Sequence, residues 1–271
     1  MPSITDQSFL LDSQYRDSSN LDARIAVHQL FSTNPVGWYR WYFDHLRLPP
    51  AAVILDIGCG PGRFWCDQLQ CIPPDWRITL ADLSPGMVTQ AEANLRAAGA
   101  GDDPRFRFQT ADAQTLPFDD DAFDALLANH MLYHVPDLPR ALAEIRRVLR
   151  PAGRLFAATN GAGHMQELGD LLAPFSSNRS ALLAPERRFG LENGGQQLAR
   201  VFAHVERHDY KDSLEISEVA PLVAYVLSTR NMFWTASAEP SVEALTQHFE
   251  TVLARDGVIH ISKASGLFVT A

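Results

Sequence analysis

The chain has 271 residues, of which 46% are hydrophobic and 20% charged, a composition that excludes disordered and collagen-like proteins and predicts a soluble globular one. Its 32 acidic and 23 basic residues give a net charge of −9, which argues against a nucleic-acid partner held by phosphate neutralisation. No apolar run approaches the roughly 18 residues that a membrane span needs, and the first residues lack the basic start of a secretory signal. We therefore expect a cytoplasmic protein with neither a nucleic-acid nor a membrane partner.

The three cysteines, Cys59, Cys66 and Cys71, are odd in number and close together in the chain. This arrangement does not predict a disulfide framework, in keeping with a reducing cytoplasm. No histidine accompanies them at a zinc-binding spacing, so we expect no metal site.

The first 48 residues are expected to be mostly helical. Apolar residues recur at helical spacing over 21–31, after the capping pair Ser19-Asn20 and before the breaker Asn34-Pro35. A second, aromatic helix is predicted over 38–46, and Pro49-Pro50 ends this region.

From residue 51 onward, short apolar runs alternate with amphipathic stretches. This alternation predicts an α/β fold with βαβ units and a parallel, doubly wound sheet. Strands are expected at 52–55, 76–81, 105–109, 123–128 and 154–159, followed by helices and loops over 161–202. A strand at 204–210, helices at 217–228 and 240–255, and one closing strand over 257–270 complete the prediction.

The loop after the first strand carries the strongest functional pattern. An apolar strand ends at Asp56, and glycines follow at positions 58, 60 and 62. One glycine would suffice for a tight turn, whereas three alternating glycines at the carboxyl end of a strand indicate a ligand-binding loop. A dinucleotide fingerprint would need its third glycine at Arg63, and a phosphate-binding P-loop would need a G-K-[ST] ending, which is absent.

The segment Val53-Ile54-Leu55-Asp56-Ile57-Gly58-Cys59-Gly60-Pro61-Gly62 resembles the first motif of class I S-adenosylmethionine (SAM)-dependent methyltransferases, hydrophobic-D-x-G-C-G-x-G. The resemblance covers residues 51–160. It implies a Rossmann-like sheet of about seven strands with the last one antiparallel, a helical lid, and SAM as the cofactor.

The resemblance also implies which residues meet the cofactor. Asp82, at the end of the second strand, matches the acidic residue that binds the ribose hydroxyls, although a role as a helix cap or turn residue is an alternative. Tyr15 and Arg16 are candidates for the cofactor carboxylate, because arginine suits bidentate binding, or they only pack. The expected cofactor-binding set is Asp56, Gly58, Cys59, Gly60, Gly62, Asp82, Leu83, Asp112, Ala113, Asn129, His130, Tyr15 and Arg16.

The acceptor side is less defined by the sequence. In-line methyl transfer requires alignment of the acceptor, and a weak nucleophile also requires a base. His134 and Tyr133, just past the fourth strand, are the catalytic candidates, the alternative being that this segment is the packed start of a helix.

Further residues are predicted to bind the acceptor, each with a structural alternative. Asn160 and His164 follow the fifth strand, where His164 is otherwise a surface residue at a helix start. Trp38 belongs to the aromatic helix, for which simple packing is favoured. Glu192 and Asn193 lie in the following insert, and there we favour a turn over substrate recognition.

Together these patterns predict an N-terminal lid (1–48), a SAM-binding core (49–160), a helical cap (161–200) and a C-terminal part of the core sheet (201–271). The predicted function is methyl transfer to a small-molecule acceptor, by a monomer or homodimer, in biosynthesis. One alternative is an enzyme of the same fold that cyclises or cleaves SAM with release of methylthioadenosine, or that acts as a pericyclase. Another is a noncatalytic SAM-binding protein.

Overall fold

The computed structural model of the chain describes residues 5–7, 19–175, 187–229, 234 and 239–271. Tyr15 and Arg16, which were predicted to meet the cofactor, lie outside the described residues.

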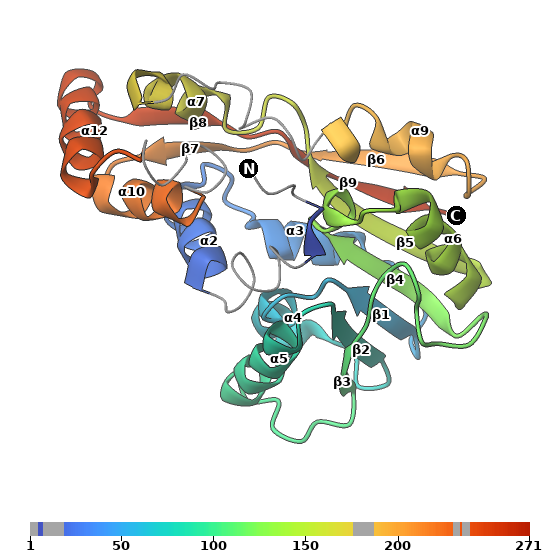
Figure 1. Cartoon of the computed structure of the whole chain (residues 1–271). Coiled ribbons are helices and arrows are strands. Elements are labelled where there is room, and N and C mark those ends of the chain that lie inside the picture. Colours follow the sequence, from blue (N-terminus) through green and yellow to red (C-terminus); the bar gives the residue numbers. More distant parts are fainter. Residues whose placement is uncertain (1–4, 8–18, 176–186, 230–233, 235–238) are drawn as a thin grey trace.

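A seven-stranded sheet forms the centre of the molecule (Figure 1). Its strands lie in the order β3-β2-β1-β4-β5-β9-β6, and β9 runs antiparallel to both of its neighbours. The predicted doubly wound sheet with an antiparallel last strand is therefore confirmed. The strands are β1 (Val53–Ile57), β2 (Arg77–Asp82), β3 (Phe106–Thr110), β4 (Phe123–Asn129), β5 (Leu149–Asn160), β6 (Val205–Tyr210) and β9 (Ser265–Thr270).

Helices cover both faces of this sheet because their apolar positions recur at helical spacing. In α6 (Leu138–Val148), for example, Leu138, Ala141, Leu142 and Ile145 are all buried against one face. The shorter α9 (Gly194–Leu198) joins the same cluster. The opposite face is covered by α3 (Trp38–His45), α4 (Arg63–Gln68) and α5 (Pro85–Ala97).

A second layer lies beyond the sheet and has its own hydrophobic core. It combines a two-stranded antiparallel sheet, β7 (Ser213–Ile216) with β8 (Ile259–Ser262), and four helices. These helices are α2 (Ser19–Phe31), α7 (Gln166–Leu172), α10 (Val219–Ser228) and α12 (Val242–Asp256). We call this layer, gathered on the left in Figure 1, the cap. None of the described helices has the length and apolar character needed to cross a membrane.

The cap corrects one prediction. The run 257–270, predicted as a single strand, is divided into β8 and β9, which belong to different sheets. Of residues 201–271, β6 and β9 do complete the main sheet, whereas the segment between them supplies most of the cap core. The chain passes from sheet to cap and back at two adjacent junctions, Lys211-Asp212 and Lys263-Ala264.

Candidate active site

The glycine loop between β1 and α4 has the backbone geometry that its sequence predicts. Gly58, Gly60 and Gly62 have φ angles of 71°, 54° and 71°, in the left-handed region that favours glycine. A Cβ at Gly58 would lie 2.7 Å from Met131 Cγ, and one at Gly62 would lie 3.1 Å from Ala91 Cβ. At Gly60 the nearest atom to a Cβ would be Leu21 Cδ2 at 3.6 Å, so the backbone there is open to a ligand.

Asp82 lies beneath this loop and is bonded to it. Its Oδ2 accepts a hydrogen bond from the backbone N–H of Gly60 at 3.0 Å, and its Oδ1 accepts one from Ser84 N–H at 2.9 Å. Burial raises the pKa of Asp82, although these hydrogen bonds partly oppose the rise. The side chain that caps α5 is Ser84, not Asp82. Because a carboxylate has about four acceptor positions, Asp82 keeps capacity for a bound ligand.

Asp56, at the end of β1, is 2% exposed. Its Oδ2 accepts a hydrogen bond from Trp65 Nε1 at 2.8 Å, whereas its Oδ1 is buried without a partner among the described residues. Burial is the main reason that the pKa of Asp56 rises to about 7. Asn129 Oδ1, at the end of β4, is likewise buried without a partner among those residues. Two adjacent strand ends thus present unsatisfied acceptors, which fit a ligand that carries hydrogen-bond donors.

A cavity of about 980 Å³ opens along the carboxyl ends of the strands and continues under the cap. Its volume is at the upper end of the range of about 300–1,000 Å³ for ligand sites. Most predicted cofactor residues line it: Asp56, Gly58, Cys59, Gly60, Asp82, Leu83, Asp112, Ala113, Asn129 and His130. Gly62 is not among the lining residues, since it packs against Ala91 of α5.

The predicted catalytic pair also faces the cavity. Tyr133 and His134 form a 3-10 turn, η3 (Leu132–His134), and their rings are 4.6 Å apart. Asp137 follows this turn, and its N–H donates to Gln114, whose side chain is bonded to Asp112. The pair therefore belongs to the part of the wall near the third strand.

Three of the predicted acceptor-binding residues line the cavity, namely Asn160, His164 and Trp38. The Trp38 ring also packs against His130 and Tyr210, with centroids 5.5 and 5.2 Å away. The packing predicted for Trp38 is therefore present, and its role in acceptor binding stays a prediction.

Glu192 and Asn193 lie outside this cavity. Glu192 Oε1 accepts a hydrogen bond from the N–H of Ala162 at 2.9 Å. Asn193 Oδ1 accepts one from the N–H of Gly190 at 2.9 Å, and its side chain also donates to the carbonyl of Arg187. The Asn193 side chain thus forms the turn that the sequence favoured, whereas the Glu192 side chain joins this turn to the segment after β5. Neither residue lines the cavity where the acceptor was predicted to bind.

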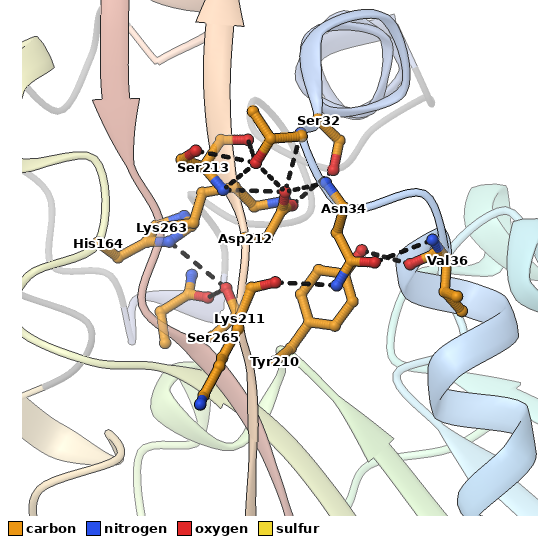
Figure 2. A network of polar contacts seen from close by, with 12 residues as sticks. Ser32, Asn34, Val36, His164, Tyr210, Lys211, Asp212, Ser213, Lys263 and Ser265 are labelled. Carbon is orange, nitrogen blue, oxygen red and sulfur yellow. Dashed lines mark hydrogen bonds and ion pairs between the residues drawn. The ribbon is translucent and has the colours of Figure 1, made fainter.

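The cap supplies cavity residues that sequence reasoning missed, among them His28 of α2, Tyr225 of α10, and Lys263 and Ser265 at the second junction. Lys263 pairs with Asp212 at the first junction, as Figure 2 shows. No local pattern in the sequence distinguishes these residues from ordinary polar positions.

Three histidines, His28, His130 and His164, share this wall with Lys263. Burial is the largest cause that lowers the pKa of His28 to about 3 and that of His130 to about 4, and the Lys263 charge adds to both shifts. The pKa of His164 also lies well below its ordinary value, through burial first and then the neighbouring His28. The histidines are therefore uncharged near neutral pH and act as neutral hydrogen-bonding groups.

Comparison with known proteins agrees with this geometry. Residues 55–157 match the family described as a methyltransferase domain. The chain is 35% identical over 131 residues to the ubiquinone/menaquinone biosynthesis C-methyltransferase UbiE of Hahella chejuensis, covering 48% of this chain and 49% of that protein. It is 35% identical over 124 residues to malonyl-[acyl-carrier protein] O-methyltransferase of Serratia marcescens, covering 45% and 43% respectively. The chain thus spans about half the length of these curated relatives.

In three dimensions the chain is similar to phosphoethanolamine N-methyltransferase 2 of Haemonchus contortus, solved in complex with S-adenosyl-L-methionine. The TM-score is 0.59 at 18% identity, with coverage of 100% of this chain and 60% of that one, which shows a shared fold. The fold and the glycine loop agree with the resemblance of this chain to class I SAM-dependent methyltransferases. Residues 55–157 belong to the methyltransferase-domain family, and the cofactor is SAM.

The raised pKa of Asp56 leads to a prediction about stability. Asp56→Asn should stabilise the protein, and the gain should grow as the pH rises from about 4 to about 7 and then level off. In this window the folded chain keeps the Asp56 proton that the unfolded chain, with a pKa near 3.8, has released, so a rising pH favours unfolding of the parent protein only.

Urea denaturation at about pH 5, 6, 7 and 8 measures this gain. Asn keeps an oxygen for Trp65 Nε1, and the exposed Asp119→Asn is the control. A gain that is larger at the acidic end than at the basic end would contradict the assignment.

Proposed function

We propose that the chain transfers a methyl group from SAM to a small-molecule acceptor by in-line displacement. The observation that carries the proposal is the single cavity that begins at the glycine loop and continues under the cap, since it provides space for two reactants side by side. Methyl transfer requires little beyond the alignment of two bound molecules, which one continuous cavity favours.

The cofactor half of the cavity is built by the first four strands. We assign the ribose hydroxyls to Asp82, the adenine edge to Asp112 and Ala113, and the methionine end to Asn129 and His130. The open backbone at Gly60 and the free acceptor capacity of Asp82 support this assignment. When bound, SAM supplies an electrophilic methyl group on a sulfonium.

The acceptor half is built by the cap and the junctions. In this proposal the cap elements α2, α10, α12, β7 and β8 act as the cover that excludes water and determines which acceptor fits. His134 and Tyr133 remain the candidates for accepting a proton or positioning the acceptor, and Asn160, His164 and Trp38 complete the acceptor wall.

Incubation with SAM, alone and with a small-molecule cell extract, tests the proposed reaction by mass spectrometry. We expect S-adenosylhomocysteine only when the extract is present, together with an extract component that is heavier by one methylene. Methylthioadenosine formed from SAM alone would contradict methyl transfer and favour cleavage or cyclisation of the cofactor. An unchanged SAM pool in every extract would favour a binding protein or a pericyclase.

Asp82→Ala should weaken binding of S-adenosylhomocysteine by roughly 1.5–3 kcal/mol, because a charge-assisted hydrogen bond is lost. Its melting temperature should also fall, since the N–H groups of Gly60 and Ser84 lose their acceptor. Isothermal titration calorimetry measures the affinity, with exposed Asp119→Ala as control. Normal affinity combined with a lower melting temperature would show that Asp82 only shapes the turn.

His134→Ala should lower kcat/KM for the acceptor found in the extract by roughly 100-fold, the scale of a lost general base or a lost positioning contact. Affinity for S-adenosylhomocysteine should stay within about twofold. A loss in kcat indicates a base, whereas a rise in KM indicates positioning. The exposed His204→Ala is the matched control, and equal kinetics of both variants would exclude a role for His134.

A further inference from the structure

Among the described residues, carboxylates line only one half of the cavity. The acidic lining residues within the described part of the chain are Asp56, Asp67, Asp82 and Asp112, all on the first three strand ends or on α4. The same half also holds Arg40 and Arg63, which are paired with Asp44 and Asp22. The wall under the cap carries Arg24 and Lys263 without any carboxylate in its lining, together with the three histidines His28, His130 and His164. An acidic half suits a cationic cofactor, and the opposite half suits a ligand of the opposite charge.

Lys263 presents unused donors to this wall. Its side chain is 6% exposed, and within the described residues its ammonium donates only to Asp212 and lies 5.4 Å from the Tyr210 ring. An ammonium has three N–H donors, so two remain. Asp212 itself does not line the cavity, and Ser32 and the backbone N–H groups of Thr33 and Asn34 also bond to it. The cavity therefore faces the cation and not its counter-ion.

The side chains near Lys263 add hydrogen-bond donors to this wall but no carboxylates. Arg24 donates to Ser228 Oγ and to its carbonyl, both at 3.3 Å, and has no carboxylate partner among the described residues. His28 Nδ1 is buried without a partner there, and His164 Nδ1 lies 3.4 Å from Ser265 Oγ. The described His, Cys, Asp and Glu side chains form no group of three or more that could hold a metal ion, so the histidines are not explained by metal binding.

We propose that Lys263 and the histidines His28 and His164 bind a carboxylate carried by the acceptor. This inference rests on the proposed function, whose acceptor it specifies. A carboxylate offers two oxygens to several donors at once and arrives ionised at neutral pH. A hydroxyl or phenol would need a base, and histidines that are surrounded by protein beside a lysine are poor proton acceptors. With a carboxylate acceptor, the effect of His134→Ala should appear mainly in KM.

Titration with benzoate and with benzamide, its neutral isostere, tests the site in the protein saturated with S-adenosylhomocysteine. We expect benzoate to bind at least about tenfold more tightly than benzamide, because only the carboxylate gains charge-assisted hydrogen bonds. The double variant Lys263→Met/Asp212→Asn removes the pair without leaving a lone buried charge, and should abolish this preference. Lys211→Met removes an exposed neighbouring charge and should leave the preference intact.

A second variant tests the proposal if the double variant does not fold. His164→Phe keeps the Lys263–Asp212 pair and a ring of similar shape, and should reduce the benzoate preference by a factor of about three or more. Equal binding of benzoate and benzamide to the parent protein would overturn the proposal. The proposal would also be overturned if the double variant lost affinity for S-adenosylhomocysteine by the same factor as affinity for benzoate. In that case the wall would bind the carboxylate of the cofactor, not that of the acceptor.

Titration of S-adenosylhomocysteine alone separates the two proposals. Absence of cofactor binding would remove the proposed methyl transfer, and a benzoate preference measured without cofactor would still support the carboxylate site. Normal cofactor binding without any benzoate preference would remove the carboxylate site and leave methyl transfer standing.

Discussion

One buried carboxylate, Asp212, ties the cap to the main sheet. It accepts hydrogen bonds from Ser32 at the end of α2, from Thr33 and Asn34 beyond it, and from Lys263 across the junction (Figure 2). Burial would raise its pKa, but the bonds from Lys263 and Ser32 outweigh that effect and hold the pKa of Asp212 below its ordinary value. Three segments far apart in the sequence thus meet at one charge, and the position of the cap over the strand ends depends on it.

The two halves of the cavity differ in how far apart in the sequence their residues lie. The cofactor half is local, because each βαβ unit brings the end of one parallel strand next to the last, and Asp56 and Asp82 lie at two such ends. The acceptor half is nonlocal. His28 and His164, whose rings are 6.0 Å apart, come from α2 and from the segment before α7, and Lys263 comes from the last junction. Only after the cap has docked do these side chains share a wall.

This difference explains how far the sequence was informative. The strand alternation and the glycine spacing predicted the main sheet and its ligand edge, because both are written in short, regular patterns. The division of 257–270 was missed, since a β-branched run with scattered polar residues looks the same whether it crosses one sheet or two. His130 and His164 were singled out by their places after strands, whereas His28 and Lys263 were missed, because a single histidine or lysine carries no spacing that predicts a partner more than a hundred residues away.

Burial is the main cause of the low pKa values of the histidines, and the charge at the junction adds to it. Lys263 brings a positive charge into a wall where burial already disfavours ionised groups, so each nearby imidazole remains neutral. Because the imidazoles around the Lys263 ammonium are neutral, the empty wall does not contain several buried cations that would repel one another. The imidazoles and Lys263 also keep hydrogen-bond donors available for a ligand. A carboxylate bound there accepts the remaining N–H groups of Lys263, and its negative charge raises the pKa of the imidazoles. The ion pair that positions the cap therefore also determines what charge the space beneath the cap can accept.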